Sequence, residues 1–86
     1  MAGERGIVVY ACSSHYVVET YGGYVLLEWY GGADPVKGEG IFGDLHSYGF
    51  KDLVLIERKS ETRAWIDDYL LSRDSVLSKL RSKGCS

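Results

Sequence analysis

The chain has 86 residues, enough for one domain with a single modest core, and carries a formal net charge of -2. That charge argues against general nucleic-acid binding, which usually requires a basic surface. No apolar run approaches the roughly 18 residues needed to span a bilayer. The short apolar stretch near the start follows an acidic residue, Glu4, and is too brief for a signal peptide. We therefore expect one domain over residues 1–86 and a cytoplasmic location.

The first third of the chain predicts β-strands. Residues 6–12 form a β-branched and aromatic run of the kind that favours a strand. Residues 15–21 and 24–30 are two further runs of this kind, separated by Gly22-Gly23. A glycine pair between two such runs favours a two-residue hairpin turn, because a type I′ turn needs a positive φ at both positions. The sequence therefore predicts a strand followed by a hairpin.

A second strand pair is predicted in the middle of the chain. It comprises residues 41–47 and 53–58, joined by a turn at Ser47-Tyr48-Gly49-Phe50. The apolar run over residues 53–56 does not alternate with polar residues. Such a run is typical of a strand that is covered on both faces or central in its sheet.

The last third changes its periodicity. Its large apolar residues fall within one arc of a helical wheel: Trp65, Ile66, Tyr69, Leu70, Val76, Leu77 and Leu80. We therefore favour one amphipathic helix of some 20 residues, capped at Ser60 or Thr62 and closed by Lys83-Gly84. The rival interpretation is a strand over residues 62–70 followed by a shorter helix from Ser72, because the segment at Ser72 also resembles an N-cap.

These elements predict an α+β fold. Four or five mostly antiparallel strands form a sheet, open or barrel-like, and one long amphipathic C-terminal helix packs on one face. One helix covers only part of such a sheet, while the chain contains seven tyrosines, two tryptophans and two phenylalanines. Tyrosine and tryptophan are enriched at protein interfaces. We therefore expect an interface at Tyr16, Tyr24, Trp29 and Tyr30, the alternative being cross-strand aromatic pairs on the outer sheet face.

One short motif suggests chemistry. Gly43-Asp44 precedes a strand that ends in Glu57-Arg58-Lys59 and is followed by Ser60. In this respect the segment resembles the restriction-endonuclease-like nucleases, and among them the structure-specific endonucleases in which Gly-Asp precedes Glu-Arg-Lys. The resemblance implies that Asp44 and Glu57 bind Mg²⁺ and that Lys59 positions or activates the attacking water.

Other candidate groups are scattered along the chain. Asp44, His46 and Asp52 form a second candidate cluster for a metal or for acid–base chemistry. Metal binding at the acidic pair Asp67-Asp68 requires partners from another element. Cys12 and Cys85 are the two cysteines, and they are either free thiols or a disulfide that closes a loop of about 70 residues.

The leading hypothesis is a small non-enzymatic interaction module without a cofactor. It forms a homodimer or docks a protein partner through its aromatic sheet surface. The second hypothesis is the Mg²⁺-dependent nuclease that uses Asp44, Glu57 and Lys59. The third is a nucleic-acid accessory or regulatory domain that uses basic residues near the C-terminus, namely Arg73, Lys79, Arg81 and Lys83.

Overall fold

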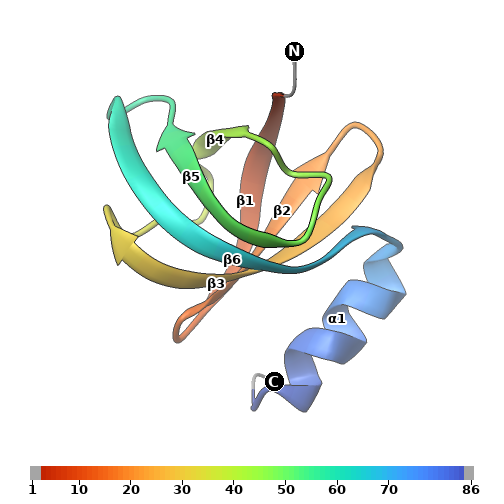
Figure 1. Ribbon diagram of the computed structural model, residues 1–86. Helices are drawn as coiled ribbons and strands as arrows, with labels where there is room; N and C mark the ends of the chain where they lie inside the picture. Colours follow the sequence, from red (N-terminus) through yellow and green to blue (C-terminus); the bar gives the residue numbers. More distant parts are fainter. Residues whose placement is uncertain (1–2, 85–86) are drawn as a thin grey trace.

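The computed structural model, which describes residues 3–84, is a closed six-stranded antiparallel β-barrel followed by one short helix (Figure 1). The strand order around the barrel is β1-β2-β3-β6-β5-β4, and β4 pairs back onto β1. The elements are β1 (Glu4–Cys12), β2 (His15–Thr20), β3 (Gly23–Gly32), β4 (Gly40–Gly43), β5 (Gly49–Leu55), β6 (Ser60–Leu71) and α1 (Arg73–Ser82). The protein is thus mostly β, and the expected four or five strands are corrected to six. The described part of the chain contains no helix long and apolar enough to cross a membrane.

The predicted hairpin is confirmed. β2 and β3 pair in antiparallel register from His15 opposite Glu28 to Thr20 opposite Gly23. The connecting turn is therefore Tyr21-Gly22, one residue earlier than predicted. The second strand pair also forms, but β4 ends at Gly43 and β5 begins at Gly49, so both predicted ranges shift.

The prediction of a 20-residue helix is wrong, and the rival interpretation is correct. In β6, Thr62, Ala64 and Ile66 are buried inside the barrel, while the residues between them are exposed. This alternation has the period of a strand. It was hidden because two of its three inward residues are small, so the large apolar residues alone suggested a helical period. The helix begins after Ser72, whose side chain accepts a hydrogen bond from the Ser75 amide at 3.1 Å.

Two separate apolar clusters stabilise the fold. The first fills the barrel with buried side chains from all six strands: Val8, Tyr16, Val18, Val25, Leu27, Ile41, Leu45, Leu53, Leu55, Ala64 and Ile66. The second lies outside the barrel, where Val17 and Leu26 pack with Val76 and Leu80 of α1. The helix therefore packs over the outer face of β2 and β3 and contacts the end of β6, and it leaves the outer face of β4, of β5 and of the first half of β6 uncovered.

Candidate functional site

The structure does not bring the predicted nuclease residues together. Glu57 lies in the turn between β5 and β6, and its Oε1 accepts a hydrogen bond from the Gly40 amide at 2.9 Å, where β4 begins. Asp44 follows Gly43 at the other end of β4. Four residues of extended chain span roughly 13 Å, so the two carboxylates sit too far apart to share one metal ion.

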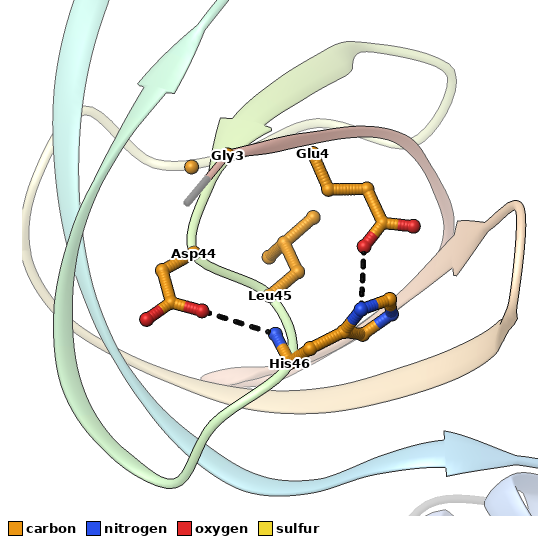
Figure 2. Close-up of a pocket in the computed structure, with 6 residues that line it drawn as sticks. Gly3, Glu4, Asp44, Leu45 and His46 are labelled. Atoms are coloured by element: carbon orange, nitrogen blue, oxygen red, sulfur yellow. Dashed lines mark hydrogen bonds and ion pairs between the residues drawn. The ribbon is translucent and has the colours of Figure 1, made fainter. Parts of the chain in front are cut away.

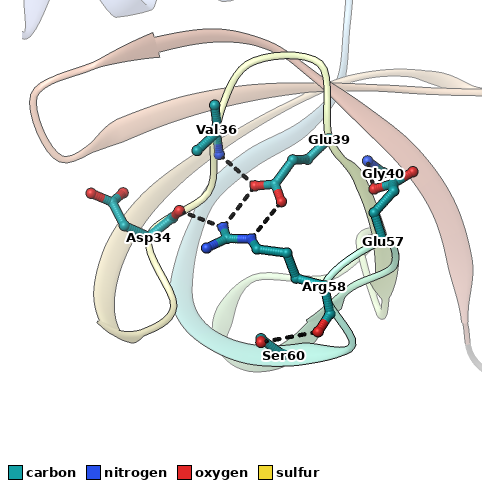
Figure 3. A network of polar contacts seen from close by, with 7 residues as sticks. All are labelled: Asp34, Val36, Glu39, Gly40, Glu57, Arg58 and Ser60. Carbon is teal, nitrogen blue, oxygen red and sulfur yellow. Dashed lines mark hydrogen bonds and ion pairs between the residues drawn. The ribbon is translucent and has the colours of Figure 1, made fainter.

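The Glu57-Arg58-Lys59 segment has a clear structural role in the turn (Figure 3). The Arg58 guanidinium donates from Nε to Glu39 Oε2 at 2.7 Å and from a terminal nitrogen to Glu39 Oε1 at 2.8 Å. It also donates to the Asp34 carbonyl at 2.7 Å. The hydrogen bonds from Arg58 are the main reason that the pKa of Glu39 is lowered. Lys59 is exposed and has a φ of 53°, as a tight turn requires. The segment thus ties the β3–β4 loop to the β5–β6 turn.

Asp44 organises the loop that leads into β5. Its carboxylate accepts hydrogen bonds from the Ser47 hydroxyl at 2.8 Å and from the His46 amide at 3.3 Å. Lys51 Nζ lies 3.3 Å from the same carboxylate. These contacts, led by the Ser47 hydrogen bond, lower the pKa of Asp44. The side chain that the motif assigns to a metal is therefore engaged in a turn.

His46 lies at one mouth of the barrel, in a polar pocket of about 280 Å³ (Figure 2). Its Nδ1 is 2.8 Å from Glu4 Oε1, and the pocket is lined by Gly3, Glu4, Gly43, Asp44, Leu45 and His46. Asp52 is elsewhere, on the outer face of β5, where it accepts a hydrogen bond from Arg63 at 3.0 Å. The second predicted cluster, Asp44 with His46 and Asp52, is therefore divided between two parts of the molecule.

The four predicted interface residues occupy different environments. Tyr16 is only 2% exposed and points into the barrel, where its hydroxyl donates to Asp34 and burial raises its pKa. Trp29 packs against the barrel core, and Tyr24 packs beside α1. Tyr30 is 54% exposed and is the one member of the set that lies on an open surface.

The predicted disulfide is not described by the structure. Cys12, at the end of β1, packs against the cluster beneath α1, while Cys85 lies outside the described residues. The pairing of the two cysteines therefore stays a prediction.

A group of three exposed aromatic rings crosses the uncovered side of the barrel. Tyr30 on β3 and Trp65 on β6 flank Phe50 on β5. The Phe50 ring makes edge-to-face contacts with both, with centroid distances of 5.0 Å to Tyr30 and 4.9 Å to Trp65. Edge-to-face packing is a favourable arrangement for aromatic rings. The contacts hold the three side chains in one ordered patch.

A second apolar group lies on the same side of the barrel. Phe42 on β4 is directly opposite Val54 on β5, and with Ile56 and Arg5 they line a shallow apolar hollow. The exposed ion pair between Arg63 and Asp52 separates this hollow from the aromatic rings. We call the whole surface the uncovered wall; its apolar members are Tyr30, Phe42, Phe50, Val54 and Trp65.

Sequence reasoning missed four of these five residues. Phe50 was assigned to a turn, Trp65 to the apolar face of a helix, Phe42 to a strand, and Val54 to a strand that is covered on both faces or central in its sheet. The available signal was the non-alternating run over residues 53–56, which predicted a strand with two apolar faces. Comparisons with protein-family models, with curated proteins and with solved structures found no match to this chain. Its own geometry therefore has to support any proposal about its function.

Proposed function

We propose that the protein is a small non-enzymatic interaction module that forms a homodimer through the uncovered wall. The observation that carries the proposal is the exposure of large apolar side chains along β5, where Phe50 is 56% exposed and Val54 is 39% exposed. Side chains of this size form two apolar groups on neighbouring strands, one on each side of the Arg63–Asp52 pair. On a soluble protein such a surface commonly marks an interaction site.

The sequence of β5 supports a second covering layer. The run Leu53-Val54-Leu55-Ile56 is apolar on both faces, as in strands that are buried on both sides. The barrel interior covers Leu53 and Leu55, which are fully buried. The other face, with Val54, has no partner layer within the described chain, whereas α1 provides that layer for β2 and β3. A second copy of the wall supplies the missing cover.

The distribution of charge on the wall fits a second copy of the same chain. The Arg63–Asp52 pair places one cation and one anion at the centre, both more than half exposed. A two-fold axis near this pair sets Arg63 of one copy against Asp52 of the other. It also places the aromatic rings of each copy on the apolar hollow of its partner. Such self-complementarity is what an isologous interface requires.

The area available is sufficient for a modest dimer. A standard interface buries about 800 Å² per partner, which is roughly a sixth of the 4971 Å² surface of this chain. The exposed parts of the three rings supply about 300 Å² if each side chain offers about 200 Å² in total. The hollow and the polar rim must supply the rest. Because association costs several kcal/mol, we expect micromolar rather than nanomolar dimerisation.

Sedimentation equilibrium over a range of concentrations, in the presence of EDTA, tests the proposal. We expect a monomer–dimer equilibrium that Phe50→Ser weakens at least ten-fold, because a symmetric interface loses the ring twice. Tyr21→Ser is the matched control, since Tyr21 is fully exposed in the β2–β3 turn, away from the wall. A chain that stays monomeric at millimolar concentration, or a dimer that Tyr21→Ser weakens as much as Phe50→Ser, would refute the proposal.

A charge-reversal pair tests the two-fold arrangement itself. Arg63→Asp places two acidic residues at the centre of each wall, so we expect it to weaken the dimer. The double variant Arg63→Asp/Asp52→Arg restores opposite charges across the axis and should recover most of the affinity. If the double variant dimerises no better than Arg63→Asp, the proposed pairing between copies is incorrect.

A further inference from the structure

We propose that His15, Glu28 and Asp67 form a binding site for a divalent transition-metal ion, with Zn²⁺ as the representative ion. The three side chains offer one ligand atom each, and these atoms all lie within 4.8 Å of one another. Within the described residues this is the one group of three or more histidine, cysteine and acidic side chains that meets such a distance. The site borders the proposed dimer surface, because the Tyr30 hydroxyl donates a hydrogen bond to Glu28 Oε1 at 3.3 Å.

Three adjacent strands bring these residues together. His15 on β2 is directly opposite Glu28 on β3, and Glu28 is directly opposite Trp65 on β6. Asp67 lies two residues beyond Trp65 and therefore points to the same outer face of the barrel. Because strands of a closed barrel have no free edge, the three Cα positions are well fixed. A site built on such a frame requires only side-chain rotations to close.

A β-bulge brings Asp67 into position. Leu26 pairs with Asp68 while the next residue, Leu27, pairs with Ile66, so Asp67 is the extra residue in β6. A bulge of this kind re-aims side chains and is often found beside functional sites. One carboxylate oxygen of Asp67, Oδ2, is shielded from solvent and makes no hydrogen bond within the described chain, but it lies 3.4 Å from the Lys83 ammonium. An acceptor in that state is suited to a cation.

The ligand set indicates the class of metal. Imidazole nitrogen together with carboxylate oxygen suits Zn²⁺ and the neighbouring transition metals, whereas Mg²⁺ and Ca²⁺ prefer oxygen alone. Donors bound at about 2.0–2.2 Å to a tetrahedral ion lie roughly 3.3–3.6 Å apart. The ligand atoms, which now lie within 4.8 Å of one another, must therefore approach one another by up to about 1 Å when a metal ion binds. Three protein ligands leave a fourth position for water.

Lys83 competes with a metal ion for Asp67. Its Nζ lies 3.4 Å from Asp67 Oδ2. Lys83 is also the C-cap of α1, so a bound metal displaces the contact that ties the end of the helix to β6. The His15 backbone pairs with β1 and β3, but its side chain makes no hydrogen bond or ion pair to the described part of the chain. Its ring is therefore available to a ligand.

Isothermal titration of tag-free protein with ZnCl₂, and separately with MgCl₂, tests the proposal. We expect one Zn²⁺ per chain with a Kd on the order of 10 µM or tighter, and binding of Mg²⁺ at least a hundred-fold weaker. His15→Gln and Glu28→Gln should each weaken Zn²⁺ binding at least ten-fold. His46→Gln is the matched control, because His46 lies at the barrel mouth and pairs with Glu4. Circular dichroism confirms that each variant is folded.

Lys83→Met provides an independent measurement in the opposite direction. Removal of the competing ammonium should tighten Zn²⁺ binding several-fold, whereas Lys79→Met, which removes the neighbouring pair with Asp68, should leave the affinity unchanged. Absence of Zn²⁺ binding would overturn the proposal. So would binding that survives His15→Gln but is lost in His46→Gln, since the metal would then be held at the pocket in Figure 2.

Discussion

Leu26 and Leu27 are neighbours on β3, both 1% exposed, yet they belong to different apolar clusters. Leu27 points into the barrel, and Leu26 points outward beneath α1. The structure therefore predicts that the alanine substitutions at these two positions differ in their energetic coupling to α1. Leu26→Ala should be energetically coupled to Val76→Ala on α1, whereas Leu27→Ala should not, although the two leucines are adjacent in sequence.

The expected magnitudes follow from how each site can relax. A buried leucine replaced by alanine costs about 2–5 kcal/mol, depending on how far the surroundings collapse into the cavity. Leu27 is enclosed by strands on all sides and should fall near about 4 kcal/mol. Leu26 lies under a helix that can shift toward the barrel, and should cost about 2–3 kcal/mol. Val76→Ala should cost about 2 kcal/mol.

Urea denaturation of the four proteins in each double-mutant cycle measures the coupling. We expect an interaction energy of about 1 kcal/mol for Leu26 with Val76, and a value within about 0.5 kcal/mol of zero for Leu27 with Val76. A chain of this length has a stability of only about 4–13 kcal/mol, so Leu26→Val replaces Leu26→Ala if the double variant is unfolded. Equal coupling in both cycles would show that the barrel interior and the helix-covered face are not separate clusters.

Three further predictions concern residues that ionise or turn the chain. Burial raises the pKa of Tyr16, so its contribution to stability is complete below the unfolded-state pKa of about 10 and is lost as the pH rises above it; Tyr16→Phe should flatten this alkaline loss in thermal melts. The hydrogen bonds from Arg58 lower the pKa of Glu39, so its contribution is complete above about pH 4.3 and lost as the pH falls through the folded-state value. Glu39→Gln should therefore be less stable than the wild type at pH 7 and equally stable in strong acid. Lys59→Gly should leave the stability unchanged or raise it by up to about 1 kcal/mol in urea denaturation, because glycine adopts the positive φ of that position without strain; a loss above 1 kcal/mol would assign the lysine side chain a role that its exposure does not suggest.

The sequence was sufficient to predict the β-hairpin and the presence of a C-terminal helix. Local signals determine both, namely glycine in the β2–β3 connection and a serine cap at the helix start. It was insufficient for β6, because inward positions of a barrel strand accept residues as small as Thr62 and Ala64. Their burial depends on the closeness of the opposite barrel wall, which local periodicity does not report.

The candidate metal site was beyond prediction for a similar reason. Asp67 appeared on the sequence as an acidic residue that needed partners from another element. His15 and Glu28 are those partners only if β2, β3 and β6 are adjacent, and the strand order places β6 beside β3 although 27 residues of chain lie between Gly32 and Ser60. The β6 bulge at Asp67 has no distinctive residue type to mark it in the sequence.

The location of the proposed interface depends on which face of each strand the barrel encloses. An alternating strand offers two sets of side chains, and pairing along the chain does not say which set is inside. On β3, Trp29 packs against the core while its neighbour Tyr30 is exposed. On β6, Ile66 is inside and Trp65 is outside. The aromatic content of the sequence therefore predicts that an interface exists but does not predict its position. Closure of the barrel determines that the side chains of Tyr30 and Trp65 lie on the outer surface. Because α1 packs over Val17 and Leu26 and reaches β6 only near Asp67 and Asp68, these rings stay exposed, and under the proposal a second copy buries them.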